Sequence, residues 1–162
     1  MRQLSAALGS IESYEMCKHK KLYEISKDLA RNTYGFLDSK GPGLGNHATN
    51  QFISNLSLLA KKEFGADFSE KRVCGSSSLA VDFYFPDEGI IVEVALGLKN
   101  SNTEYEKDII KAIMAKNLGN RVEKLVYFTK PGGEKKCNQP GRCAVKEWLC
   151  NSNAIEVEVW DL

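Results

Sequence analysis

The period of hydrophobic and polar residues changes along the chain, and each change marks a predicted element. Apolar residues recur at helical spacing over residues 11–32 and again over residues 46–64, after which Gly65 is typical of a helix end. Residues 79–96 instead alternate every second position around the turn sequence Pro86-Asp87-Glu88-Gly89. The pattern therefore predicts two helices followed by a β-hairpin.

Downstream of the hairpin, helical and strand patterns alternate. Thr103 and Glu106 match a capping box at the start of a helix, and residues 124–129 form an apolar run that is typical of a strand buried on both faces. The other predicted elements are a strand over residues 70–74, a loop over 130–142, a helix over 144–150 and an outer strand over 154–160. This order predicts an α/β sandwich with a mixed sheet.

Composition places the chain among ordinary globular proteins. Its 162 residues fit one domain, and 22 basic against 21 acidic residues give a net charge of +1, which excludes a polybasic coat protein. No apolar run approaches the roughly 18–20 residues of a membrane span, and the N-terminus lacks the apolar core of a signal peptide. We expect a cytoplasmic protein without membrane contact, organised as an N-terminal helix and loop (11–45), a core (46–129) and a C-terminal helix and strand (130–162).

Two carboxylates stand out in the predicted hairpin. If the turn is centred between Asp87 and Glu88, Asp82 faces Glu93 across the strands. Like charges directly opposite each other destabilise a hairpin, so a counter-charge such as Mg²⁺ is expected between them. Two alternatives stay open: each carboxylate points to solvent, or a one-residue register shift separates the pair. The opposite face of the hairpin is predicted to be core and carries Val81, Phe83, Phe85, Ile90, Val92 and Val94.

An aspartate near one strand end, a hairpin and then Glu-x-Lys on the next strand form the motif of the PD-(D/E)xK nuclease superfamily, and this chain resembles it up to the lysine. Asp82 matches the motif aspartate, with Val81 in place of the preceding proline, and Glu93 matches the motif acid. The predicted order helix–three strands–helix–strand over residues 46–129 is also similar to that superfamily's core. The resemblance covers about half the chain and implies a restriction-endonuclease-like three-layer sandwich.

The resemblance also implies an activity and a site. The expected protein is a nuclease that uses Mg²⁺ or Mn²⁺ to hydrolyse phosphodiester bonds, with DNA as its substrate and a homodimer as its state. Asp82, Glu93 and the carbonyl of Val94 would hold the metal. His47 and Asn50, on the predicted second helix, would aim at the metal, at its water or at DNA, and Lys107 would also contact nucleic acid. A capping and surface role for residues 46–50 is the open alternative.

Ala95 stands where the family has its lysine, which puts catalysis in question more than the fold. Some superfamily members take the basic group from elsewhere, and Lys99, Lys107 and Lys111 are the candidates in this chain. Without such a lysine, the chain would be a catalytically impaired nuclease-fold module that binds nucleic acid or a protein partner. The sequence leaves both functions open.

The cysteines and basic runs offer further chemistry. One early and three late cysteines, Cys17, Cys137, Cys143 and Cys150, resemble those of the superfamily's iron–sulfur members. Their spacing lacks the close Cys-x₂-Cys step, so we expect reduced thiols and no iron–sulfur cluster. Basic runs over residues 18–21 and 135–146 are candidates for phosphate contact.

Overall fold

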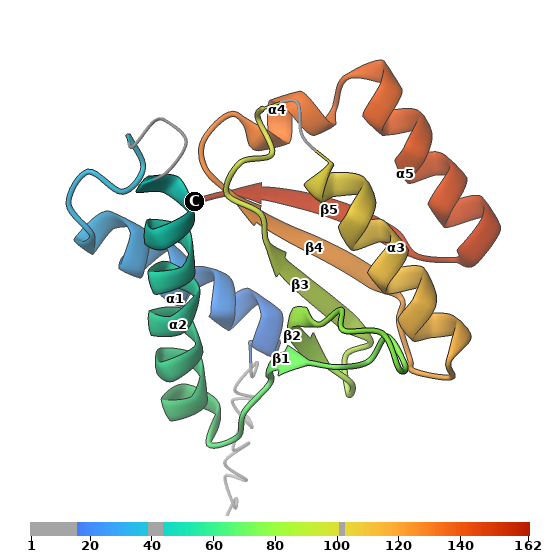
Figure 1. The fold of residues 1–162 in the computed structure, drawn as a ribbon, viewed down its shortest axis with the longest axis horizontal. Coiled ribbons are helices and arrows are strands. Elements are labelled where there is room, and N and C mark those ends of the chain that lie inside the picture. The colour runs from blue at the N-terminus through green and yellow to red at the C-terminus, as the bar shows by residue number, and fades with distance from the viewer. Residues whose placement is uncertain (1–15, 39–43, 101–102) are drawn as a thin grey trace, which may run out of the picture.

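A mixed β-sheet lies between two layers of helices (Figure 1). The computed structural model describes residues 16–38, 44–100 and 103–162. Within these ranges, helices α1 (Lys18–Asn32) and α2 (Leu44–Phe64) cover one face of the sheet, and α3 (Glu104–Asn117) and α5 (Pro140–Asn153) cover the other. The prediction of an α/β fold with a mixed sheet and flanking helices is confirmed.

The described strands follow one another across the sheet in chain order. They are β1 (Ser69–Lys71), β2 (Val81–Phe85), β3 (Ile90–Val94), β4 (Lys124–Thr129) and β5 (Glu156–Asp161). β1, β2 and β3 pair antiparallel and β3, β4 and β5 pair parallel, so among the described strands β2 runs against the other four. Because α3 follows β3 and α5 follows β4, the amino ends of both helices lie at the carboxyl edge of these strands.

Side chains of the hairpin alternate between two hydrophobic cores. The core beneath α1 and α2 contains Phe83, Phe85, Ile90, Val92 and Val94, as predicted. The core beneath α3 contains Tyr84, Ile91, Ala95, Tyr105, Ile109 and Tyr127. Val81, predicted for the first core, packs in the second, because β2 begins at this residue and the alternation of the strand does not yet fix its direction.

Four helix predictions differ from the structure, and one of them is α2, which begins at Leu44 and not at residue 46. α1 begins at Lys18 and not at residue 11, because Cys17 has an extended ψ of 141° as its N-cap; residues 11–15 lie outside the described ranges. α5 begins at Pro140 and not at residue 144, because the first helical turn does not need the N–H that proline lacks. A further short helix, α4 (Gly133–Cys137), occupies part of the predicted loop.

The predicted capping box and several strand ends are also wrong. Thr103 is the N-cap of α3, but its φ of −98° and ψ of 7° are not those of a capping residue, and its side chain forms no cap hydrogen bond in the described structure. The first strand is β1 at Ser69–Lys71 in place of 70–74, and β3 ends at Val94, where a turn follows.

The C-terminal part of the chain completes the sheet. β4 matches the predicted run 124–129 and is buried along nearly its whole length, and β5 is the predicted outer strand. β5 pairs with β4 over six positions, from Lys124–Glu156 to Thr129–Asp161. No helix in the described ranges is long and apolar enough to cross a membrane.

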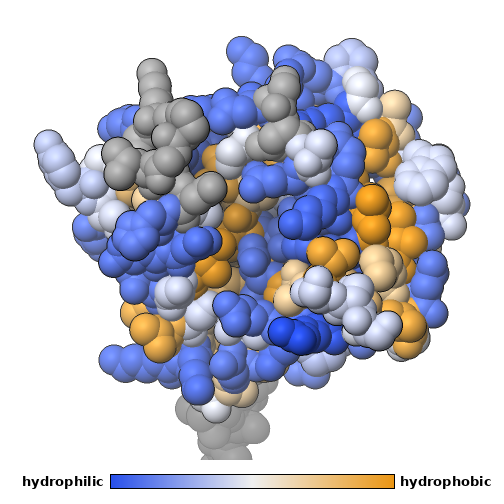
Figure 2. Space-filling model, in the orientation of Figure 1, coloured by the Kyte–Doolittle hydropathy of each residue, from blue (hydrophilic) through white to orange (hydrophobic). Residues whose placement is uncertain are grey.

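Hydrophobic residues reach the surface on the layer of α3 and α5. Figure 2 shows a largely hydrophilic face on which hydrophobic residues gather over these helices. Ile110 on α3 and Trp148 on α5 are each 54% exposed. The helical layer that covers the face of Glu93 is therefore partly apolar on its outer side.

Candidate functional site

Asp82 and Glu93 face each other at the open end of the hairpin. The pairing of Phe83 with Val92 sets the register, and the next position places Asp82 opposite Glu93, as the turn predicted. The Val94 N–H donates to Asp82 Oδ2 at 2.7 Å, and the Asp82 N–H donates to Glu93 Oε2 at 3.3 Å. The alternative of a shifted register is therefore wrong.

A lysine from the next helix reaches this pair of carboxylates. Lys111 Nζ lies 3.1 Å from Glu93 Oε1 and 2.8 Å from Asp108 Oδ1. Asp108 and Lys111 are three residues apart on α3, so both side chains leave the same side of the helix. Glu93 is 2% exposed, Asp108 and Lys111 are also buried, and Asp82 is half-buried. We call these four residues the carboxylate–lysine cluster.

Burial dominates the electrostatics of this cluster. It raises the pKa of Asp82, and together with the Asp82 and Asp108 carboxylates it raises the pKa of Glu93 well above the usual range. Burial also raises the pKa of Asp108 to about 6. For Lys111, burial opposes the charged form, but the Glu93 and Asp108 carboxylates outweigh it and raise the pKa of the ammonium. The lysine stays charged, and carboxylates surround it.

The chemistry of the donor set suits a hard divalent cation. Asp82 and Glu93 offer the carboxylate oxygens that Mg²⁺ and Mn²⁺ prefer. With every group ionised, three carboxylates and one ammonium leave two negative charges uncompensated within the cluster, and a divalent ion would balance them. Val94 lies against Asp82 through its N–H; its carbonyl as a further metal ligand stays a prediction.

The other residues predicted for the site lie elsewhere. Of the three candidate lysines, Lys111 is the one at Glu93, whereas Lys99 and Lys107 are exposed. His47 and Asn50 are exposed on α2, which packs on the opposite face of the sheet from Glu93. The structure therefore does not bring them to the cluster.

Asp108 is the member of the cluster that the sequence prediction missed. The sequence did contain a sign of this residue's role, because Asp108 and Lys111 have the i, i+3 spacing of an ion pair on a predicted helix. The sequence does not show how that helix is rotated about its own axis. This rotation decides which of its polar side chains contact Glu93.

The late cysteines do not converge on one centre. Cys137 lies in α4, whereas Cys143 and Cys150 are two turns apart on α5, about 10 Å along its axis. Cys137 is buried and accepts a hydrogen bond from Arg142 Nη1 at 3.3 Å. Cys17 lies at the start of α1, on the other face of the sheet.

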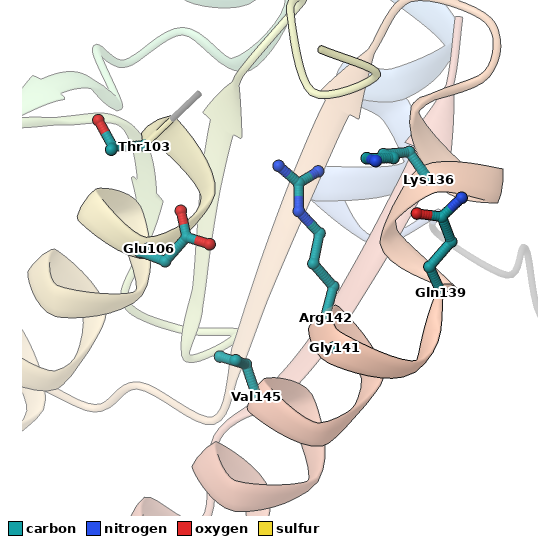
Figure 3. A pocket seen from close by; sticks show the side chains of 7 residues that line it. All are labelled: Thr103, Glu106, Lys136, Gln139, Gly141, Arg142 and Val145. Atoms are coloured by element: carbon teal, nitrogen blue, oxygen red, sulfur yellow. The ribbon is translucent and has the colours of Figure 1, made fainter. Parts of the chain in front are cut away.

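A basic pocket lies between the amino ends of α3 and α5 (Figure 3). It is lined by Thr103, Glu106, Lys136, Gln139, Gly141, Arg142 and Val145. Arg142 Nη1 donates to the Leu98 carbonyl at 2.6 Å, and its guanidinium lies 5.0 Å from the centre of the Tyr105 ring. Glu106 faces the two basic side chains across the pocket. The pocket and the carboxylate–lysine cluster are distinct sites joined by α3.

No protein-family model matches this chain, and searches of curated proteins and of solved structures give no match either.

Proposed function

We propose that the protein is a metal-dependent nuclease that hydrolyses phosphodiester bonds, with DNA as its substrate. One observation carries the proposal: Lys111 Nζ contacts the same Glu93 that faces Asp82. Two carboxylates and a lysine thus meet at one strand end, although Ala95 stands at the motif position for the lysine. We propose that Lys111 of α3 takes the role of the motif lysine, and its contact with Glu93 supports this.

The order of elements supports the same proposal. From α2 to β4 the chain forms helix, three antiparallel strands, helix and a parallel strand. This is the order of the superfamily core that the sequence resembles. We therefore propose that the sandwich is restriction-endonuclease-like, with β5 and α5 added after the core.

Each residue of the cluster has a proposed role. Asp82 and Glu93 hold Mg²⁺ or Mn²⁺, which when bound supplies Lewis acidity and a more acidic water. Lys111 presents an ammonium donor beside Glu93 and is placed to bind the attacking water or a phosphate oxygen. Asp108 is a positioning residue, because its carboxylate holds the Lys111 ammonium.

The basic pocket of Figure 3 is the proposed contact for the phosphate backbone. Lys136 and Arg142 lie at the carboxyl edge of the parallel strands, the same edge to which Glu93 is close. Arg142 is already oriented by the Leu98 carbonyl and Tyr105, so little side-chain freedom would be lost on binding. The homodimer implied by the resemblance stays a prediction.

A catalytically impaired binding module is the second candidate, and one observation favours it. Glu93 is 2% exposed and already forms an ion pair with Lys111. A cation would have to enter past Asp82, the half-buried member of the cluster. If the cluster stays closed, it stabilises the fold and the basic pocket alone binds nucleic acid.

A cleavage assay separates these two functions. The chain is incubated with Mg²⁺ or Mn²⁺ and with single-stranded, double-stranded or branched DNA, or with RNA. We expect metal-dependent cleavage of DNA that falls at least about 100-fold in Glu93→Gln and in Lys111→Met, the size of effect seen when one stabilising group is removed from an active site. Lys107→Met is the matched control, because Lys107 is an exposed lysine one turn earlier on the same helix.

The outcomes of this assay distinguish the nuclease from the binding module. DNA binding without cleavage of any substrate would assign the chain to the binding module. Cleavage that survives Lys111→Met but is lost in Lys107→Met would move the catalytic lysine to the exposed position. A chain that neither binds nor cleaves nucleic acid contradicts the nuclease and leaves only the module that binds a protein partner.

A further inference from the structure

A second group of metal-binding side chains lies at the turn end of the hairpin. Cys17 precedes α1, His19 is in its first turn, and Glu88 is in the turn between β2 and β3. One ligand atom from each of the three lies within 4.8 Å of the other two. Asp82 and Glu93 each lie three residues, about 10 Å, from the turn end of their strands, so this group is separate from the carboxylate–lysine cluster.

Glu88 and His19 are held in place by the fold. The Lys18 N–H donates to Glu88 Oε1, and the His19 N–H donates to Glu88 Oε2 at 3.2 Å, so Glu88 satisfies two free donors at the start of α1. His19 Nδ1 lies 2.6 Å from Glu88 Oε2, and the His19 side chain is 8% exposed. Two potential ligands are thus fixed before any metal binds.

Within the described residues, the Cys17 side chain, unlike those of His19 and Glu88, is not held by a hydrogen bond at the start of α1. Cys17 is the N-cap of α1, yet its side chain forms no cap hydrogen bond in the described structure, because Glu88 serves the start of the helix from another element. The thiol is exposed and lines a surface pocket together with Lys18, Lys21, Glu63 and Glu88. It is therefore accessible both to an ion and to solvent.

We propose that Cys17, His19 and Glu88 bind a zinc-type divalent transition-metal ion that clamps α1 to the hairpin turn. Thiolate sulfur, imidazole nitrogen and carboxylate oxygen are the ligands of zinc in proteins, and water can complete a set of three protein ligands. Cys17 and Glu88 line the same surface pocket. Binding forms three metal–ligand bonds and releases the thiol proton to solvent. His19 Nδ1 must carry no hydrogen when it binds the ion, so a proton there moves to Nε2 of a neutral ring, or to solvent if the ring is charged.

The geometry requires only small adjustments. Ligands at 2.0–2.1 Å in a tetrahedral site lie about 3.3 Å apart, so His19 Nδ1 and Glu88 Oε2 separate slightly from 2.6 Å while the exposed Cys17 side chain turns inward. The two lysines that line the surface pocket each form an ion pair with a carboxylate. Lys18 pairs with Asp87 at 3.1 Å and Lys21 with Glu63 at 3.4 Å, which lessens their repulsion of a cation.

A cobalt titration tests this site. Co²⁺ is added to the metal-free full chain, and the thiolate-to-cobalt charge-transfer band is followed in the near ultraviolet. We expect the band to saturate at one equivalent, to be displaced by Zn²⁺, and to disappear in Cys17→Ser. Zn²⁺ affinity should fall at least about tenfold in Cys17→Ser. Removing a residue that only hydrogen-bonds to a metal ligand already weakens binding about 10–100-fold, and removing a ligand itself should cost at least as much. Cys150→Ser, at another exposed cysteine, is the matched control and should leave both readouts unchanged.

Three outcomes would overturn the proposal. These are no charge-transfer band in the wild type, a band that persists in Cys17→Ser, and a band lost in Cys150→Ser. The result is independent of the proposed nuclease, because the Asp82→Asn/Glu93→Gln double variant removes the negative charges of the other site and should keep the thiolate band. If the wild type shows no band, the His19–Glu88 pair serves only to cap α1.

Discussion

At the scale of single residues, Asp108 gives the cluster a pH dependence. Burial raises the pKa of its carboxyl from 3.8 to about 6, so the folded protein holds the proton more tightly than the unfolded chain does. This stabilising contribution is present at low pH and is lost as the pH rises from about 4 to about 6, by on the order of 2–3 kcal/mol. Asp108→Asn keeps an oxygen for Lys111 but cannot titrate. In urea unfolding across this pH range, the free energy of unfolding should fall less for the variant than for the wild type. Parallel curves for the two proteins would contradict this role of Asp108.

The residues of the cluster differ in how far sequence could predict them. Asp82 and Glu93 follow from local rules, because the turn fixes the register and the alternation fixes the faces. Lys111 does not follow, because Lys107 and Lys111 are one helical turn apart and share a face. Only the packing of α3 on the sheet decides which of the two reaches Glu93.

At the scale of elements, the β2–β3 hairpin joins the core to the site. Its turn is defined by Gly89, whose φ of 66° is a conformation that glycine adopts readily. The same strands put Phe83 and Phe85 on one face and the two carboxylates, beside Tyr84, on the other. Val81 shows the limit of the alternation rule, which holds within a strand and fails at the residue where the strand begins.

Truncation of a core side chain tests the assignment of the two faces. Phe83 is fully buried in the core beneath α1 and α2, so Phe83→Ala should lower the free energy of unfolding by about 3–5 kcal/mol. Leu58→Ala on α2 is the control, because Leu58 is 68% exposed and a surface change should stay within about 0.5 kcal/mol. Chemical denaturation measures both variants, and similar losses for the two would mean that the faces are wrongly assigned.

At the scale of the whole molecule, the sandwich places different chemistry at the two ends of one hairpin. The oxygen-rich cluster lies at the open end beneath α3, and the Cys17–His19–Glu88 group lies at the turn beside α1. Element order allowed the layers and the mixed sheet to be predicted. The second group joins residues about 70 positions apart, a long-range contact that no local pattern in the sequence reveals.

A calorimetric titration with Mn²⁺ tests the proposed metal centre at Asp82 and Glu93 most directly. It is best done in the Cys17→Ser background, so that the thiol group does not contribute. We predict one bound ion, with affinity at least about tenfold weaker in Glu93→Gln, where the amide oxygen still accepts from Lys111, and unchanged affinity in Glu147→Gln, at an exposed glutamate on α5. Equal Mn²⁺ binding with Glu93 and with Gln at this position would contradict a metal centre at Asp82 and Glu93.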